Sequence, residues 1–92
     1  MPKLFEIGGY TIFFWSNENN EPIHVHIVKG TPSSNATKVW LTKNGGCVVA
    51  HNKGQIPQHD LNEILDAISI SYFRICDEWK RYFLVDDVQF YC

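Results

Sequence analysis

Two histidines are the residues of this chain whose type and spacing could support chemistry. His24 and His26 lie two positions apart in the stretch Ile-His-Val-His-Ile-Val at residues 23–28. In a β-strand, side chains two apart point to the same face, roughly 7 Å from each other, and two imidazoles at that separation can share a metal ion. The spacing therefore permits a metal site or a pair of acid–base groups.

The loop before this strand supplies carboxylates. Glu18 or Glu21 could join His24 and His26 in a site of two histidines and one carboxylate, which suits zinc or iron and leaves positions open for water or substrate. No third histidine or later carboxylate falls at a spacing that compels a ligand shell. The sequence therefore predicts no cofactor, with a divalent metal at His24 and His26 as the alternative.

A second chemical interpretation is RNA cleavage, with His24 or His26 as general base and acid because imidazole titrates near neutrality. Lys29, Lys53 or Arg74 would then steady a phosphate. Eight Lys and Arg against ten Asp and Glu give a net charge of −2, which lacks the basic excess that drives nucleic-acid binding. Nucleic acid is therefore disfavoured as a partner.

A structural interpretation needs no ligand. Asn17, Glu18 and Glu21 would cap the turn, and charge-assisted hydrogen bonds to His24 and His26 would lock the loop onto the strand. These five residues form the candidate polar site. The same cluster at a sheet edge could also receive a strand or loop of a partner protein.

Turn-forming residues separate five short runs of β-branched and aromatic residues, at positions 4–7, 10–15, 23–28, 38–42 and 47–51. Gly8-Gly9 and Asn44-Gly45 tolerate the positive φ of tight turns, so we predict two hairpins. The run at 47–51 could equally be an irregular stretch or a short helical turn, because its apolar residues do not alternate. In the middle run, the alternation places Ile23, Val25 and Ile27 on the face opposite His24 and His26.

From Gln58 onward the apolar period changes to steps of three and four, which is typical of helices. We expect two helices that meet near Ser69, with Asp60 and Glu63 as a capping pair at the start of the first and serine hydroxyls capping the second. The tail at residues 84–92 is too apolar for a free end. It is expected to dock, either as an edge strand of its own sheet or against another chain.

The 92 residues predict one domain, 1–92, of the α+β class. We expect an antiparallel sheet of about four or five strands built from hairpins, packed on one face by the two C-terminal helices. No signal peptide or membrane span is evident, and the three cysteines form no Cys-x-x-Cys pair. A cytoplasmic protein with reduced thiols and no membrane partner is expected.

The aromatic residues divide between core and surface. Most must build the core of so short a chain, and we assign four to it: Tyr10, Phe14, Trp40 and Trp79. Aromatic residues at element ends and in the apolar tail favour protein interfaces. They make up the candidate interface with the aliphatic residue between them: Trp15, Tyr82, Val88, Phe90 and Tyr91.

Several motifs together resemble the bacterial family of domain of unknown function DUF4160. The most specific is a Ser-Asn-Glu turn at residues 16–18 followed by Glu-Pro-Ile-His-Val-His at 21–26. Lys-Val-Trp-Leu, Asn-Lys-Gly and Glu-Trp-Lys-Arg-Tyr-Phe accompany it further along, at 38–41, 52–54 and 78–83. Two features depart from the family: Ile23 replaces a usual second proline, and residues 85–92 extend past the usual end.

The resemblance implies a small prokaryotic cytoplasmic protein without an established activity, whose gene often lies beside another small gene in a toxin–antitoxin-like arrangement. It favours a non-enzymatic interaction protein that binds the cognate small protein of the neighbouring gene and can form a homodimer. The alternative is a metal-binding protein or a hydrolase or ribonuclease that uses His24 and His26. Loss of activity in a folded His24→Ala/His26→Ala variant would favour that alternative.

Overall fold

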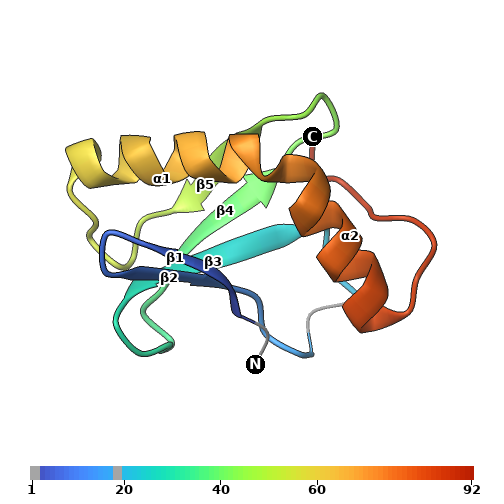
Figure 1. Cartoon of the computed structure of the whole chain (residues 1–92), viewed down its shortest axis with the longest axis horizontal. Coiled ribbons are helices and arrows are strands. Elements are labelled where there is room, and N and C mark those ends of the chain that lie inside the picture. The colour runs from blue at the N-terminus through green and yellow to red at the C-terminus, as the bar shows by residue number, and fades with distance from the viewer. Residues whose placement is uncertain (1–2, 18–19) are drawn as a thin grey trace.

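The fold is seen in a computed structural model of the chain, which describes residues 3–17 and 20–92. Five strands precede two helices along these residues (Figure 1): β1 (Lys3–Ile7), β2 (Tyr10–Phe13), β3 (His24–Lys29), β4 (Thr37–Leu41), β5 (Cys47–His51), α1 (Gln58–Ile70) and α2 (Tyr72–Phe83). None of these helices is long and apolar enough to cross a membrane.

The strands form one antiparallel sheet in the order β1-β2-β3-β4-β5, so each strand pairs with its neighbours in the sequence. Gly8 and Gly9 have φ of 56° and 84°, which L-residues with side chains rarely adopt, and they make the turn between β1 and β2. Gly45, with φ of 95°, serves the turn between β4 and β5. Both predicted hairpins and the α+β class are confirmed.

The alternation in β3 divides the sheet into two faces. Ile23, Val25 and Ile27 are fully buried in the core between the sheet and the helices, as predicted. The register pairs His24 with Trp40, and it pairs His26 with Phe13 on one side and Lys38 on the other. The histidines therefore belong to the face away from that core.

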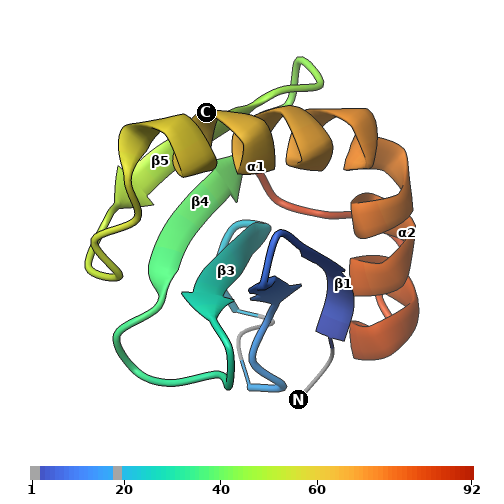
Figure 2. The ribbon, with the colours of Figure 1, turned by 60° about the vertical axis from the view of Figure 1, so that its left-hand side comes forward.

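The two helices meet at Ser71, within two residues of the predicted position. Figure 2 shows α1 lying across β4 and β5 while α2 turns away at the corner toward β1. The residues buried by α1 and α2 lie at helical spacing: Leu61, Ile64, Ile68, Tyr72, Ile75, Cys76 and Trp79. This is the apolar period of three and four residues that predicts the helices from the sequence.

The predicted helix caps were wrong. Pro57 is the N-cap of α1, and no side-chain hydrogen bond from the described part of the chain caps this helix. The Asp60 carboxylate instead accepts a hydrogen bond of 2.8 Å from the Tyr10 hydroxyl, so a partner in the sheet takes the place of Glu63. Ser71 precedes α2 without a side-chain cap, and its backbone carbonyl accepts the N–H of Ile75.

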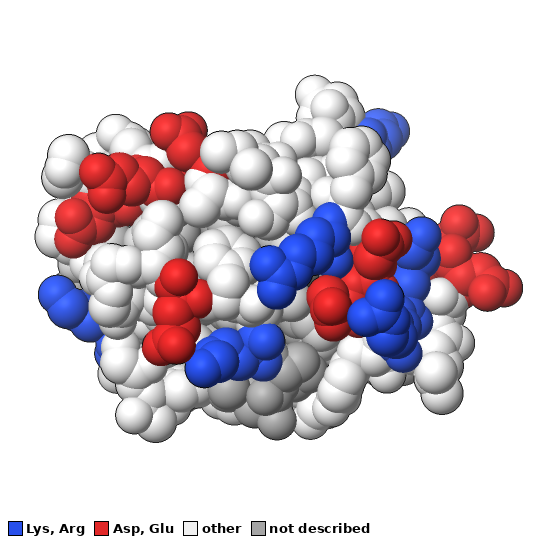
Figure 3. Space-filling view, viewed as in Figure 1, with Lys and Arg blue, Asp and Glu red and all other residues white. Residues whose placement is uncertain are grey.

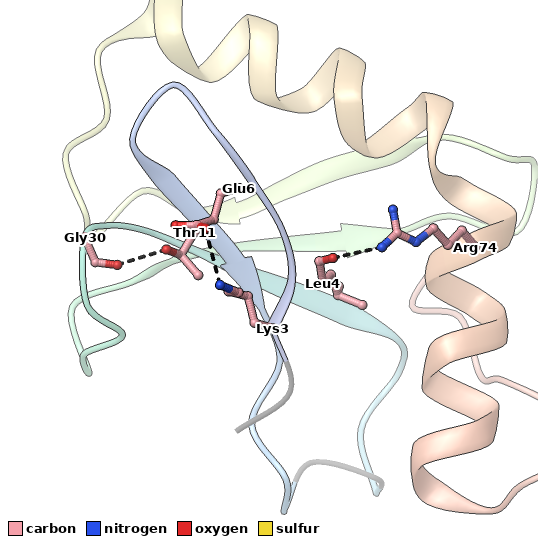
Figure 4. A network of polar contacts seen from close by, with 6 residues as sticks. All are labelled: Lys3, Leu4, Glu6, Thr11, Gly30 and Arg74. Atoms are coloured by element: carbon pink, nitrogen blue, oxygen red, sulfur yellow. Dashed lines mark hydrogen bonds and ion pairs between the residues drawn. The ribbon is translucent and has the colours of Figure 1, made fainter.

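Long-range hydrogen bonds attach β1 and β2 to the rest of the molecule (Figure 4). The guanidinium of Arg74 in α2 donates to the Leu4 carbonyl of edge strand β1 at 3.1 Å. The Thr11 hydroxyl donates to the carbonyl of Gly30, just beyond β3, at 2.9 Å. These bonds connect α2 to edge strand β1, and β2 to the residue that follows β3.

The C-terminal tail, residues 84–92, docks on its own chain without forming a strand. It begins with Leu84 in the left-handed conformation and returns toward the β4–β5 turn (Figure 1). The Ile23 N–H donates to the Gln89 carbonyl at 2.8 Å, and the Lys43 N–H donates to the Cys92 carbonyl at 2.9 Å. The tail therefore closes the end of the sheet next to α2.

Candidate functional site

The two histidines lie within a cluster of aromatic rings. His24 and His26 meet edge to face with ring centroids 5.0 Å apart. The residues whose rings contact one or both of them define what we name the histidine–aromatic cluster: Phe13, Trp15, Trp40 and Trp79, at centroid distances of 5.5, 6.3, 5.5 and 5.5 Å. Strands β2, β3 and β4 and helix α2 thus converge on one pair of imidazoles.

Both imidazoles are inside the molecule. The exposed fraction is 0% for His24 and 9% for His26. The Nδ1 atom of His24 lies 2.8 Å from the Pro22 carbonyl oxygen, which can only accept a hydrogen bond. In the neutral ring Nδ1 therefore carries the proton and Nε2 carries the lone pair. The loop before β3 fixes both the orientation and the tautomer of this ring.

The described carboxylate of the candidate polar site pairs with a lysine. Glu21 Oε1 lies 3.0 Å from the Nζ of Lys38 in β4, and the same ammonium lies 4.2 Å from the centre of the Trp40 ring. Asn17 is exposed, and Glu18 lies outside the described residues. Within residues 3–17 and 20–92, no three His, Cys, Asp or Glu side chains are grouped to hold a metal ion.

The other two histidines lie at the edge of this arrangement or outside it. His51 in β5 pairs in register with Lys38, and burial lowers the pKa of its imidazole, with the positive charges of Lys53 and Lys38 acting in the same direction. His59 is exposed on α1, where its Nε2 lies 3.6 Å from Glu63 Oε1. Only His51 lies near the candidate site.

The candidate interface residues separate into three groups. Tyr82 and Tyr91 are exposed. Val88 and Phe90 are half-buried against the core, which attaches the tail to its own chain. Trp15 is half-buried, and its ring meets Phe13 edge to face at 5.0 Å. Of the four aromatics assigned to the core, Tyr10, Phe14 and Trp79 are buried there, whereas Trp40 is half-buried on the opposite face.

The sequence analysis missed the most exposed large apolar residues of the helices. Ile70 at the end of α1 and Phe73 in the first turn of α2 are 87% and 78% exposed. We name this pair the apolar corner. A signal for it was present, because both residues fall outside the helical stripe that predicted the buried face.

An open cleft of about 650 Å³ lies between the loop after β3 and the loop after β5. Its lining combines sheet, loop and helix residues: Tyr10, Ile27, Val28, Lys29, Ser33, Asn35, Lys53, Gly54, Gln55, Ile56, Pro57 and Asp60. Of the three cations considered for a phosphate, the structure brings Lys29 and Lys53 to this cleft. Arg74 does not join them.

Comparison with known proteins gives one match. The profile of a family described as "Domain of unknown function (DUF4160)" matches residues 9–80. That match spans more than half of the chain, and the chain belongs to this family. No curated protein and no solved structure matches it.

Proposed function

We propose that this member of the DUF4160 family is a non-enzymatic interaction protein of the cytoplasm, one component of a toxin–antitoxin-like two-gene module. It acts by binding the small protein encoded by the neighbouring gene. The observation that carries the proposal is the apolar corner. Ile70 ends α1 and Phe73 lies in the first turn of α2, so they flank the junction between the helices, and both side chains are largely exposed.

The apolar corner is suited to binding by both energy and rigidity. Complete burial of a large apolar side chain contributes about 1.5–3 kcal/mol, so Ile70 and Phe73 together offer a substantial driving force. Both belong to helices whose opposite faces are fixed in the core, so little backbone ordering accompanies binding. The Tyr72 ring supports the Phe73 ring edge to face at 5.3 Å.

Neighbouring charges indicate the chemistry of the partner. Arg74 follows Phe73 directly and is exposed. The described acidic residues of α2, Asp77 and Glu78, form ion pairs with Lys80 and Arg81 further along the helix. Figure 3 shows both signs of charge on the α2 side and mainly acidic side chains over α1. A partner with an apolar patch bordered by a carboxylate fits this corner.

The burial of His24 and His26 within the histidine–aromatic cluster supports the same proposal. General acid–base catalysis requires the imidazole to lie within hydrogen-bond reach of a substrate proton. His24 and His26 are instead packed among aromatic rings, and the contact of His24 with Trp79 joins β3 to α2. We assign them a structural role, in which the described bond to the loop is the one from His24 to the Pro22 carbonyl, while Glu21 pairs with Lys38.

Co-purification tests the proposal. The tagged chain is co-expressed with the product of the neighbouring gene, and the mass of the complex is measured by size-exclusion chromatography with light scattering. We expect a complex for the wild type and for Leu84→Ser, a control at a residue that is 90% exposed outside the apolar corner. We expect its loss in Ile70→Ser/Phe73→Ser. A complex that survives in that variant would overturn the assignment of the apolar corner as the binding surface. The same chromatography of the chain without its partner measures homodimer formation.

One observation favours a second candidate, a metal-binding protein or hydrolase that uses His24 and His26. A backbone carbonyl holding Nδ1 of His24 is the arrangement that commonly orients metal-binding histidines through Nε2. Metal analysis of untagged protein tests it. Stoichiometric metal that is lost in a folded His24→Ala/His26→Ala variant would favour this function, and wild-type protein without bound metal after incubation with zinc would contradict it.

A further inference from the structure

We propose that the cleft between the loops at residues 30–36 and 52–57 binds a small phosphorylated molecule, whose phosphate is held by Lys29 and Lys53. This site is separate from the apolar corner and goes beyond the proposed partner binding. The proposal stands on three features of the cleft: walls fixed by hydrogen bonds, two lysines that pair with no carboxylate of the described residues, and a volume suited to a small ligand.

The first wall is the turn at residues 52–56, which the Asn52 side chain holds at three points. Its Oδ1 accepts the Ile56 N–H at 3.0 Å and the Thr37 hydroxyl at 2.6 Å. Its Nδ2 donates to the Ile56 carbonyl at 3.0 Å. The Thr37 oxygen in turn accepts the Gly54 N–H at 3.1 Å. The turn that carries Lys53 is therefore tied to strand β4.

This wall also explains the Asn-Lys-Gly motif. A Cβ on Gly54 would lie 2.8 Å from the Thr37 oxygen, so a side chain at this position would break the close approach. Gln55 follows with a φ of 54°, a left-handed conformation that costs about 1 kcal/mol or more for a residue with a side chain. Backbone strain of this kind is concentrated at ligand sites, because the surrounding structure must be built to maintain it.

The second wall is the loop that begins at Gly30. The Gly30 N–H donates to the Gly9 carbonyl at 3.2 Å, and the Gly30 carbonyl accepts the Thr11 hydroxyl (Figure 4). Within the same loop the Asn35 N–H donates to the Ser33 hydroxyl oxygen at 3.3 Å. Both walls are thus anchored to the sheet, and the cleft is formed before any ligand arrives.

The charges in the cleft favour an anion. Lys29 and Lys53 have no carboxylate within ion-pair distance among the described residues, whereas the nearby Lys38 pairs with Glu21. The ammonium of Lys29 lies 5.4 Å from the centre of the Tyr10 ring. The single acidic residue of the lining, Asp60, already accepts the Tyr10 hydroxyl. The described lining therefore carries two positive charges against one negative charge, a net charge of +1, and neither lysine ammonium forms an ion pair with the Asp60 carboxylate.

A phosphate monoester fits these charges and this space. Its charge of about −1.5 to −2 at neutral pH balances two ammonium groups better than a carboxylate does. The volume of about 650 Å³ lies within the range of roughly 300–1,000 Å³ that small-molecule sites occupy. Ser33, Asn35 and Gln55 offer hydrogen bonds to the hydroxyl groups of a sugar. The ligand class is therefore a sugar phosphate or a mononucleotide.

Titration followed by amide NMR tests the proposal at constant ionic strength, with inorganic phosphate, ribose 5-phosphate and adenosine 5′-monophosphate as the probes. We expect saturable shifts of the amides in both loops. The two phosphate esters should bind more tightly than inorganic phosphate. The Lys29→Gln/Lys53→Gln variant should lose at least about tenfold in affinity, because charge-assisted hydrogen bonds are the strong ones.

The matched control is Lys3→Gln/Lys43→Gln, which removes the same charge from two exposed lysines outside the cleft. It should bind like the wild type. Equally weakened phosphate affinity in both double variants, or shifts that never saturate, would overturn the site. Either result would mean that the probes respond to the general charge of the protein. Equal affinity for all three probes would overturn the sugar contacts, and much tighter binding of a single-stranded oligonucleotide would overturn a small molecule as the ligand. The Ile70→Ser/Phe73→Ser variant should bind the probes like the wild type. Failure of the proposed partner binding can therefore be distinguished from failure of the phosphate site.

Discussion

The Tyr91 ring lies flat against the Trp40 ring, with centroids 4.9 Å apart and planes inclined by 8°. Trp40 also contacts His24 within the histidine–aromatic cluster. The tail is thereby joined through one tryptophan to the buried imidazole, although the family match ends at residue 80. The tail consequently belongs to the structure that stabilises the candidate site.

Removal of this stacking contact should lower the stability of the fold. We expect Tyr91→Ala to reduce the free energy of unfolding by about 0.5–1.5 kcal/mol, the usual contribution of an aromatic pair. Deletion of residues 85–92 should cost more, because Val88 and Phe90 leave the core as well. Urea unfolding followed by tryptophan fluorescence measures both. Cys92→Ser, at an exposed position, is the control, and a Tyr91→Ala protein as stable as this control would contradict the stabilising role of the tail.

The burial of His24 gives a second expectation. His24→Ala removes a fully buried ring that contacts three others and should lower the free energy of unfolding by about 2–4 kcal/mol, as other large-to-small core substitutions do. His59→Ala, on a side chain that is 85% exposed, should change it by less than about 0.5 kcal/mol. Thermal and urea unfolding of both variants check this. Equal stability of the two would remove the structural role of His24.

The sequence predicted the strands, the helices and the two faces of β3 because these depend on local turn chemistry and on apolar periodicity. It did not predict that His24 and His26 are buried. The distant rings that enclose this region, Trp79 against His24 and Tyr91 against Trp40, lie more than fifty positions from the histidines, and no pattern within β3 reports them. Alternation assigns a side chain to a face but does not say what lies against that face.

The wrongly predicted helix caps and the unpredicted cleft have the same physical cause: both depend on contacts between residues that are distant in the sequence. Asp60 was paired with Glu63 because they are close in sequence, yet tertiary folding presents Tyr10 to its carboxylate. Lys29 and Lys53 were both noted as cations that could hold a phosphate, but only the return of the chain through β4 and β5 brings them to one cleft. Local propensity decides elements, whereas sites depend on their assembly.

Alkaline pH should destabilise the protein. The hydrogen bond to Asp60 raises the pKa of Tyr10 above 10.0, and burial raises the pKa of the Cys76 thiol above 9.0. The unfolded chain therefore releases these protons at lower pH than the folded chain does, so stability falls as pH rises. If these two groups dominate, the melting temperature should stay constant up to about pH 9. It should then decline as the pH rises through the pKa values of the two groups in the folded state.

Two tyrosine variants isolate the contribution of Tyr10 to this decline. Tyr10→Phe has no phenol to ionise, so its melting temperature should fall less steeply with pH than that of the wild type. Tyr82→Phe, at an exposed ring, should follow the wild-type curve. Melting curves across the alkaline range measure all three. Identical slopes for Tyr10→Phe and the wild type would show that the bond between Tyr10 and Asp60 does not set this pH dependence.

Gly54 provides the sharpest test of the cleft wall. Gly54→Ala places a methyl group 2.8 Å from the Thr37 oxygen, so the Thr37 hydroxyl must move away from its bonds to Gly54 and Asn52. We expect a loss of about 1–3 kcal/mol in the free energy of unfolding, as for other overpacked sites, together with broadened amide signals in residues 52–56. Gly46→Ala is the matched control, because its added methyl would lie 3.4 Å from the nearest atom, the Thr42 hydroxyl oxygen, in ordinary contact. Equal stability of the two variants would mean that the turn at residues 52–56 rearranges at little cost in free energy. A turn that rearranges so easily could not hold Lys53 in place for a phosphate.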